Sequence, residues 1–568
     1  MSTIDWCVLA GTLLLIVVYG IYKSRGNKDI DGYLLGNQSL PWYHVCLSVM
    51  ATQASAITFL SAPGLAYSTG MSFVQFYFGL PLAMIILSIT FIPIFHKLKI
   101  YTAYEFLEKR FDLKTRALTA TLFLIQRGVS TGITIYAPSI ILSTILNIDT
   151  TYTTLFIGLL VIMYTVYGGT RAVSYTQLLQ MSIIFLGMFM AGIMVVHLLP
   201  ENIGFGDALH IAGKMGRTNA IDFSFDLNNQ YTVWSGLLGG FFLQLSYFGT
   251  DQSQVGRYLT GSSVGQSRLG LLMNGLVKVP MQFLILLIGI LVFAFYQYNQ
   301  PPLFFNSYEL NKLEKSKYNA ELNSIKEEYK AVFEDKKQSV ATMTDALDTK
   351  NDEVVDRSRH EMAAADEKMK EVRKKAIDLM VKNDPHADTN DNNYIFLSFV
   401  TKYLPQGLIG LLIAIIFLAS MGSTASALNS LASTTVIDVY RRLINKNGSD
   451  QRYLNVSRIT TVVWGLFCLG IALYASKLGN LIEAVNILGS LFYGTILGIF
   501  IVAFYLKRIG GKATFWAAIV TEAIVCSIWL LDITAFLWLN VIGCALVVGI
   551  AYLLQKKVRI DKLEETAA

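Results

Sequence analysis

Apolar runs of membrane-spanning length recur along the whole chain and constrain its fold more than any other feature. A transmembrane helix needs about 20 mostly apolar residues, and such runs predict about thirteen helices here. Their expected positions are 4–22, 43–68, 73–97, 117–146, 152–168, 173–199, 231–250, 270–299, 407–440, 456–476, 481–506, 513–531 and 533–555. The mean hydropathy of +0.48 is far above the soluble range. The sequence therefore predicts an all-α integral membrane protein embedded in a lipid bilayer.

Lysine and arginine concentrate in alternate loops between these runs. If the amino terminus lies outside, the cytoplasmic loops contain the basic clusters at 23–28, 97–116, 441–458 and 507–512, and the short loops opposite contain almost none. This is the positive-inside pattern. The first run has Asp5 before it and lysines after it, the reverse of a signal peptide, so we expect it to be retained. The prediction is a multi-pass plasma membrane protein, in a bacterial inner membrane, with the amino terminus outside and the carboxyl terminus in the cytoplasm.

One long external segment, 306–393, is highly charged and slightly acidic. Its apolar residues recur at helical spacing in two stretches, which predicts a soluble antiparallel helical hairpin. The hairpin is either a solvated spacer or a docking arm for a partner protein. Because no predicted span includes it, we expect that replacing it by a short linker leaves solute affinity largely intact.

The stretch 408–440 changes from aliphatic residues to a series of small and hydroxyl residues that begins at Ser420. A lipid-facing helix has no use for so many hydroxyl groups. Close packing of helices explains some of them. A cation-binding or solute-lining helix explains them as well, because sodium prefers oxygen ligands.

Other classes of function find little support. Five cysteines lie in or beside apolar runs without paired spacing, and zinc, haem and nucleotide motifs are absent. No nucleophile, base and orienting group recur at a working spacing, so we expect neither an enzyme nor a nucleic-acid-binding protein.

The second run, LSVMATQASAITFLSAPGLAYSTG, carries polar residues at mid-membrane depth beside the pair Pro63-Gly64, and predicts a locally unwound helix that lines a cavity. Four more motifs accompany it: LKIYTAYEFLEKRF at 98–111, STGITIYAPSIIL at 130–142, YTVYGGTRAVSYTQLLQ at 164–180 and YFGTDQSQVGRYL at 247–259. Together with STASALNS at 423–430, they make the chain resemble the sodium/solute symporter family. The resemblance covers nearly everything except 300–393, and is strongest to the iodide, multivitamin and monocarboxylate symporters and related bacterial members.

This resemblance implies the LeuT-type fold, with two inverted five-helix repeats and solute and sodium bound at broken helices near the midplane. The implied division of the chain is as follows: 1–42, first helix and cytoplasmic linker; 43–199, first repeat; 200–230, external loop; 231–506, second repeat, interrupted by the charged segment 300–393; 507–568, peripheral helices and tail.

The resemblance also implies a sodium site between the broken helix and the hydroxyl-rich helix. Its backbone ligands fall on Ala51, Ala54 and Ala419, and its hydroxyl ligands on Gly422 and Ser423. Because Gly422 has no hydroxyl, we expect either that Ser426, Thr424 or water supplies the missing oxygen or that the site binds sodium more weakly. The alternative for Ser423 is that it only packs against a neighbouring helix. Some relatives bind a second sodium at an aspartate in a Tyr/Trp-Thr-Asp triplet. Here the triplet ends in Gln177, which predicts one sodium per solute.

Matching positions give the candidate solute-binding residues: Gln53, Thr58, Phe76, Arg127, Gln244, Tyr247, Lys278 and Asn486. Arg127 lies far from either end of its span, where burial of an arginine costs about 2.5 to 3.5 kcal/mol. No neighbouring predicted span offers it an obvious acidic partner. Arg127 and Lys278 therefore suggest an anionic ligand. The alternatives are that Arg127 bonds to backbone carbonyl groups or that it faces a water-filled vestibule. Tyr247 either covers the bound solute or is an ordinary core tyrosine.

We therefore expect a sodium-coupled symporter that imports a small organic anion, such as a carboxylate or sialic acid. Ile57, Thr58 and Tyr77 stand where sugar-transporting relatives carry carboxylates and amides, which argues against a hexose. The alternatives are a symporter for a neutral sugar, a passive facilitator or a transporter-like sensor.

Overall fold

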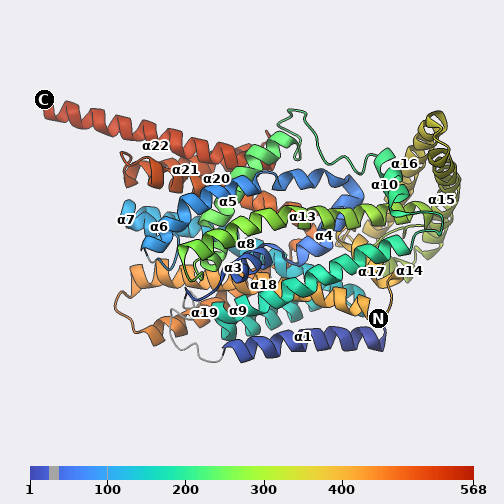
Figure 1. Ribbon diagram of the computed structural model, residues 1–568, viewed down its shortest axis with the longest axis horizontal. Helices are drawn as coiled ribbons and strands as arrows, with labels where there is room; N and C mark the ends of the chain where they lie inside the picture. The colour runs from blue at the N-terminus through green and yellow to red at the C-terminus, as the bar shows by residue number, and fades with distance from the viewer. Residues whose placement is uncertain (25–37, 99, 568) are drawn as a thin grey trace.

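The computed structural model describes residues 1–24, 38–98 and 100–567 and shows helices bundled along one long axis (Figure 1). The part of the predicted basic loop that contains Lys28 lies outside the described residues. The first half of the chain forms α1 (Thr3–Ser24), α3 (Trp42–Gln53), α4 (Ala56–Thr69), η2 (Met71–Tyr77), α5 (Leu80–Ile89), α6 (Phe91–Leu98), α7 (Glu105–Arg110), α8 (Leu113–Leu146), α9 (Thr150–His197), α10 (Phe205–Lys214), η3 (Ser235–Gly240), α11 (Phe241–Thr250), α12 (Gln252–Tyr258) and α13 (Val264–Tyr298).

The second half begins with the helices α14 (Ser307–Glu314), α15 (Asn319–Asp348) and α16 (Asp352–Asn383). The remaining elements are η4 (Asn392–Tyr394), α17 (Ile395–Tyr403), α18 (Leu408–Thr434), η5 (Thr435–Ile444), α19 (Asp450–Ala472), η6 (Ala475–Leu478), α20 (Leu481–Tyr505), α21 (Gly511–Leu530) and α22 (Phe536–Ala567). The fold is all-helical, as predicted.

Ten helices of the described residues are long and apolar enough to span a membrane, and an eleventh span is formed if the bent pair α3–α4 counts as one. Two of the thirteen predicted spans do not qualify by length and hydropathy. The run 152–168 contains only a short apolar stretch, Thr150–Met163, within α9. The run 231–250 forms the π-helical turn η3 followed by the short helix α11.

The predicted unwinding of the second span is confirmed, and its place is now defined. Helices α3 and α4 meet at 61°, and the break falls at Ala54 and Ser55, both in extended or irregular conformation. Pro63 lies inside the regular helix α4, so the Pro-Gly pair is not the point of unwinding. A Cβ on Gly64 would come within 2.1 Å of the carbonyl oxygen of Asn392, which explains why a glycine is needed there.

A second break lies at Asp251, between α11 and α12. The Asp251 side chain accepts a hydrogen bond from the backbone N–H of Ser253 at 2.8 Å and so caps α12. Sequence hydropathy had ended the seventh span just before this residue. The chain therefore carries two broken helices, as the LeuT-type fold requires.

The charged segment 306–393 forms the predicted antiparallel hairpin, α15 and α16, around an apolar core of its own. The hairpin projects from the end of the molecule where the amino terminus lies, while α22 and the carboxyl terminus point the opposite way (Figure 1). The end of this segment is not a free spacer, because Ser68 of α4 donates a hydrogen bond to the Asn392 side chain at 2.9 Å. Arg373 of α16 also pairs with Asp391 at 2.7 Å.

Candidate functional site

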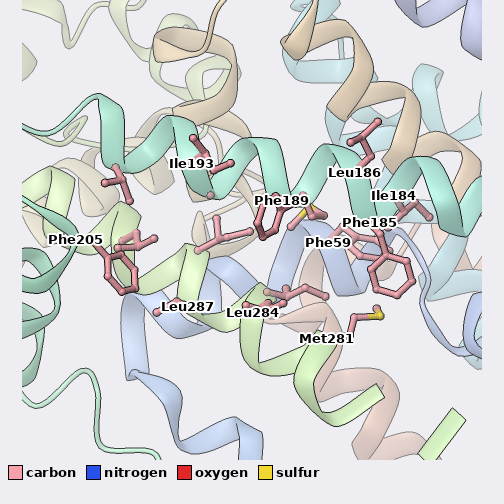
Figure 2. A pocket seen from close by; sticks show the side chains of 16 residues that line it. Phe59, Ile184, Phe185, Leu186, Phe189, Ile193, Phe205, Met281, Leu284 and Leu287 are labelled. Carbon is pink, nitrogen blue, oxygen red and sulfur yellow. The ribbon is translucent and has the colours of Figure 1, made fainter. Parts of the chain in front are cut away.

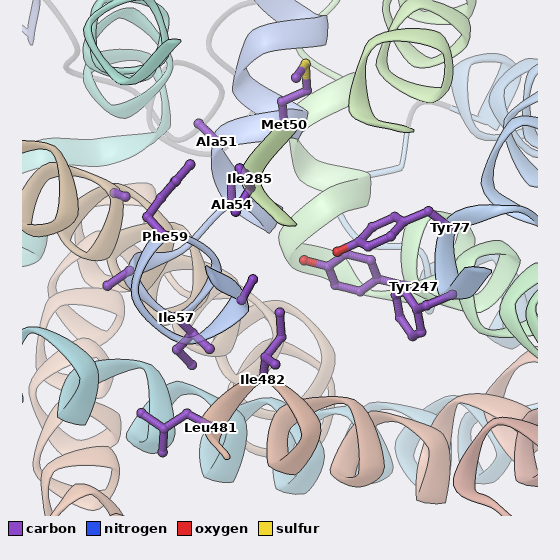
Figure 3. Close-up of a cluster of buried hydrophobic side chains, with 14 of the residues drawn as sticks. Met50, Ala51, Ala54, Ile57, Phe59, Tyr77, Tyr247, Ile285, Leu481 and Ile482 are labelled. Atoms are coloured by element: carbon purple, nitrogen blue, oxygen red, sulfur yellow. The ribbon is translucent and has the colours of Figure 1, made fainter. Parts of the chain in front are cut away.

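A small cavity lies where the two broken helices meet α8 and α20. Six of the eight predicted solute-binding residues line it: Gln53, Thr58, Phe76, Arg127, Tyr247 and Asn486. Ser130 and Tyr493 add hydroxyl groups that the sequence did not single out, and Ser55 and Tyr77 line the cavity as well. Tyr77 and Tyr247 lie side by side, with their hydroxyl groups pointing the same way (Figure 3). The cavity measures about 80 Å³, well below the roughly 300 Å³ typical of ligand sites, so solute binding requires it to open.

Arg127 has an acidic partner, contrary to the prediction that it has none. Its Nη2 donates to Asp251 and to the hydroxyl oxygen of Tyr493, which is 3.3 Å away. The Tyr493 hydroxyl donates in turn to Asp251 at 3.0 Å, and the guanidinium lies 5.4 Å from the centre of the Tyr247 ring. The Nε of Arg127 is buried and has no hydrogen-bond partner among the described residues. Hydropathy alone does not reveal the pairing, because Asp251 lies just beyond the apolar run 231–250.

Two predicted solute-binding residues, Gln244 and Lys278, do not line the cavity. Gln244 contacts the cavity residue Gln53, whose Nε2 donates a hydrogen bond to the Oε1 of Gln244 at 3.5 Å. Lys278 is fully buried in α13, and its Nζ has no hydrogen-bond partner among the described residues. It lies between Gly270, which packs against Val45 of α3, and Gly289, which packs against Pro63 of α4. Lys278 is therefore at the depth of the first break.

The predicted sodium ligands also lie near this break, where α18 packs against α3 and α4. The carbonyl groups of Ala51 and Ala54 accept no backbone hydrogen bond among the described residues, because the helix is interrupted there. On α18, the Ser423 hydroxyl donates to the carbonyl oxygen of Ala419 at 2.9 Å, which brings two predicted ligands together. Carbonyl oxygens that are free of helical hydrogen bonds and a hydroxyl oxygen are ligands that suit sodium.

Gln177 of α9 occupies the space between α3 and α18. Its amide nitrogen donates to the Thr52 hydroxyl at 3.3 Å, the Ser426 hydroxyl at 3.1 Å and the Gly422 carbonyl at 3.4 Å. Its amide oxygen accepts from Ser48 at 2.6 Å. Ser426 is thus already bound to Gln177 and is not a free replacement for the hydroxyl missing at position 422.

Gln180, one turn further along α9, shows why position 422 is a glycine. A Cβ on Gly422 would lie 2.6 Å from the Oε1 of Gln180, and Gln180 is almost fully buried. The side-chain oxygen of Gln180 therefore lies where a hydroxyl side chain at 422 would begin. Gln180 ends the YTQLLQ motif, but no pattern in the sequence indicates that it contacts position 422.

A much larger cavity, of about 610 Å³, lies on the outside of the bundle between α4, α9 and α13. Its lining is entirely apolar, and residues such as Phe59, Phe189 and Leu284 face it (Figure 2). Phe189 is 65% exposed, as expected of a side chain in contact with lipid. Since no polar group could orient a hydrophilic solute there, the small central cavity is the better candidate for transport.

Comparison with known proteins supports this assignment. Residues 33–302 and 377–521 match the model of the sodium:solute symporter family, which is more than half of the chain. The sodium-coupled monocarboxylate transporter 1 of Xenopus laevis is 26% identical over 87% of this chain and 67% of its own length. The sodium/glucose cotransporter of Vibrio parahaemolyticus is 27% identical over 90% of this chain and 82% of its own length.

A solved structure of a Na⁺-coupled sialic acid symporter superposes with a TM-score of 0.75 over 98% of both chains, at 22% identity. That likeness establishes the fold. The described helices, the two breaks and the family match lead to one assignment: the chain belongs to the sodium:solute symporter family, and is a multi-pass, sodium-coupled membrane transporter and not an enzyme.

Proposed function

We propose that this protein is a secondary active symporter that uses a sodium gradient to import a small organic anion, such as a carboxylate or sialic acid, by alternating access. The observation that carries the proposal is the central cavity at the two broken helices, which is lined by polar as well as apolar side chains and has the candidate sodium ligands near its first break. Sodium-driven accumulation in proteoliposomes tests it. A passive facilitator would equilibrate the solute without accumulating it.

An unpartnered donor at the cavity supports an anionic solute. Arg127 lines the cavity, and its Nε has no hydrogen-bond partner among the described residues, although its Nη2 is held by Asp251. A carboxylate oxygen of a solute could accept a hydrogen bond from this guanidinium. A thermal-shift screen of acids and sugars, each with and without sodium, measures this preference directly.

A neutral sugar is the second candidate. The Arg127–Asp251 pair already satisfies much of the arginine, and a glucose cotransporter is among the relatives. If sugars stabilise the protein in the presence of sodium and acids do not, the neutral substrate is the correct one.

We assign the sodium to Ala51, Ala54, Ala419 and Ser423. The side-chain oxygen of Gln180 would replace the hydroxyl that is missing at Gly422. Ser426 would lie next to these ligands, with its hydroxyl bound to Gln177. These atoms lie on three separate elements, α3 with its break, α9 and α18, so a bound sodium would join them.

Replacing Ser423 by alanine should raise the sodium concentration for half-maximal uptake roughly five- to tenfold, because one of few oxygen ligands is lost. Ser433→Ala is the matched control, since Ser433 lies on the same helix and bonds only to the Ser430 carbonyl at 3.0 Å. Uptake driven equally well by a proton gradient without sodium would contradict the assignment.

We propose that the amino terminus and the hairpin are external and that the carboxyl terminus is cytoplasmic, in a plasma membrane of the bacterial inner-membrane type. The two ends of the chain lie at opposite ends of the bundle, which fits this orientation (Figure 1). A partner protein at the hairpin 306–393 stays a prediction.

The contacts of Asn392 change the expected result of removing the hairpin. Excision of 319–383 alone should leave solute affinity within about twofold, because Lys312 and Asp384 pair across the cut and a short linker can join its ends. Excision of the whole segment 306–393 should weaken binding, since it also removes the bond from Ser68 to Asn392. Equal affinities of the two deletion variants, measured with sodium present, would show that the contact with α4 is unimportant.

A further inference from the structure

Another pocket, lined by apolar side chains and three cations, lies far from the solute cavity, at the end of the bundle opposite to the external hairpin (Figure 1). It is about 490 Å³ in volume and lies between α6, α7 and the end of α20. Three cations, Lys97, Arg110 and Lys507, surround it, and Phe106 and Phe504 form its apolar wall. This pocket has no part in the proposed transport site.

The apolar wall is a rigid aromatic cluster. Phe106 and Phe504 stack with ring centres 4.8 Å apart, and Phe91 contacts Phe504 edge-on at 4.6 Å. Phe91 is buried and anchors the cluster in the core of the bundle. The wall thus presents a fixed apolar surface directly beside the positive charges.

None of the three cations forms an ion pair among the described residues. Arg110 donates from Nε and Nη2 to the carbonyl oxygens of Ala503, Leu506 and Ile509, each at 3.2 Å, so the end of α20 holds it in position. Lys97 and Lys507 are exposed and form no ion pair among the described residues.

The acidic groups on the neighbouring segments are engaged elsewhere. Glu108 pairs with Arg116 at 2.5 Å and with Arg442 at 3.2 Å. Glu105 accepts from the backbone N–H of Tyr101 at 2.9 Å, and Asp112 caps α8 through the N–H of Thr115 at 2.7 Å. The pocket therefore combines three cations, none of them in an ion pair among the described residues, with an apolar wall.

We propose that this pocket binds an anionic phospholipid of the cytoplasmic leaflet, with the phosphate held by Lys97, Arg110 and Lys507 and the start of an acyl chain along Phe106 and Phe504. Basic pockets between transmembrane helices at the cytoplasmic surface suit such headgroups. A free phosphate would use only the cations and leave the aromatic wall exposed to water. Since α6 and α20 come from different predicted repeats, the lipid would join the two repeats at their cytoplasmic ends.

The test uses the purified full-length protein in detergent. Phosphatidylglycerol should raise the temperature of unfolding, whereas phosphatidylcholine and soluble glycerol phosphate should not. In the double variant Lys97→Gln/Lys507→Gln, the apparent affinity for phosphatidylglycerol should fall roughly 30-fold, because each basic residue near an anionic surface contributes a factor of about five. The control Lys114→Gln/Lys512→Gln removes the same charge from exposed residues outside the pocket and should bind normally.

An equal loss of affinity in the control variant would show that the general positive charge of the surface, and not this pocket, attracts the lipid. That result would overturn the proposal. Stabilisation by glycerol phosphate alone would identify a soluble anion as the ligand, and equal stabilisation by phosphatidylcholine would remove the role of the cations. If the double variant does not fold, Lys97→Gln and Lys507→Gln are measured singly, and each should weaken binding about fivefold.

Discussion

Replacing Asp251 by asparagine should abolish sodium-driven uptake and sharply reduce the yield of folded protein. Asp251 is almost fully buried, with 1% of its surface accessible to solvent. Its carboxylate accepts hydrogen bonds from Arg127, Tyr493 and Ser253. Its neutralisation leaves Arg127 charged and uncompensated. Removing one member of a buried ion pair typically costs about 3 to 5 kcal/mol, which corresponds to more than a hundredfold.

A double variant separates folding from transport. Arg127→Gln/Asp251→Asn removes both charges, so it should recover much of the stability lost in Asp251→Asn. It should still fail to transport an anionic solute, because no guanidinium faces the cavity. Thermal unfolding of the natural protein, Arg127→Gln, Asp251→Asn and the double variant gives the coupling energy of the pair, and uptake is measured on the same four proteins.

The conservative change Arg127→Lys keeps the charge and the pairing with Asp251 but loses the planar fork that binds a carboxylate at two points. We expect the protein to fold and insert, with uptake reduced by about ten- to a hundredfold. Tight sodium-dependent binding of a neutral sugar, unchanged in Arg127→Lys, would contradict an anionic substrate and favour the sugar.

The spans, the broken second helix and the hairpin were predictable because each leaves a local mark in the sequence. Length and hydropathy mark a spanning helix, and polar residues at mid-membrane depth mark the break near Gln53. The helical spacing of apolar residues marks the hairpin. All three signals depend on residues close together in the chain.

The partners within the centre left no such mark. Hydropathy ended the seventh span before Asp251, although the chain continues within the bundle as α12. The contact between Gly422 and Gln180 joins residues more than two hundred positions apart. A sequence shows that a hydroxyl is missing at 422, but only the packing of α9 against α18 shows which side chain takes its space.

The side chain at position 177 should determine how many sodium ions accompany each solute, and changing it is the second substitution with a large expected effect. Its amide nitrogen is directed at three oxygen atoms, those of Thr52, Gly422 and Ser426. The two N–H groups of the amide share these three oxygens and bring no negative charge of the kind that a buried cation needs. We therefore expect one sodium per solute in the natural protein, which makes the cycle electroneutral for a monoanionic solute.

Replacing Gln177 by aspartate should raise the coupling ratio from one towards two, because the carboxylate adds a negative charge and releases the three oxygens to a second cation. Gln177→Glu keeps the length of the side chain and should act in the same direction, whereas Gln177→Asn changes the length without adding charge and should leave the ratio at one. Reversal potentials of solute flux in proteoliposomes measure the ratio. A ratio of two in the natural protein would show that the amide does not exclude a second sodium, and a ratio of one in both acidic variants would show that charge at position 177 does not create the site.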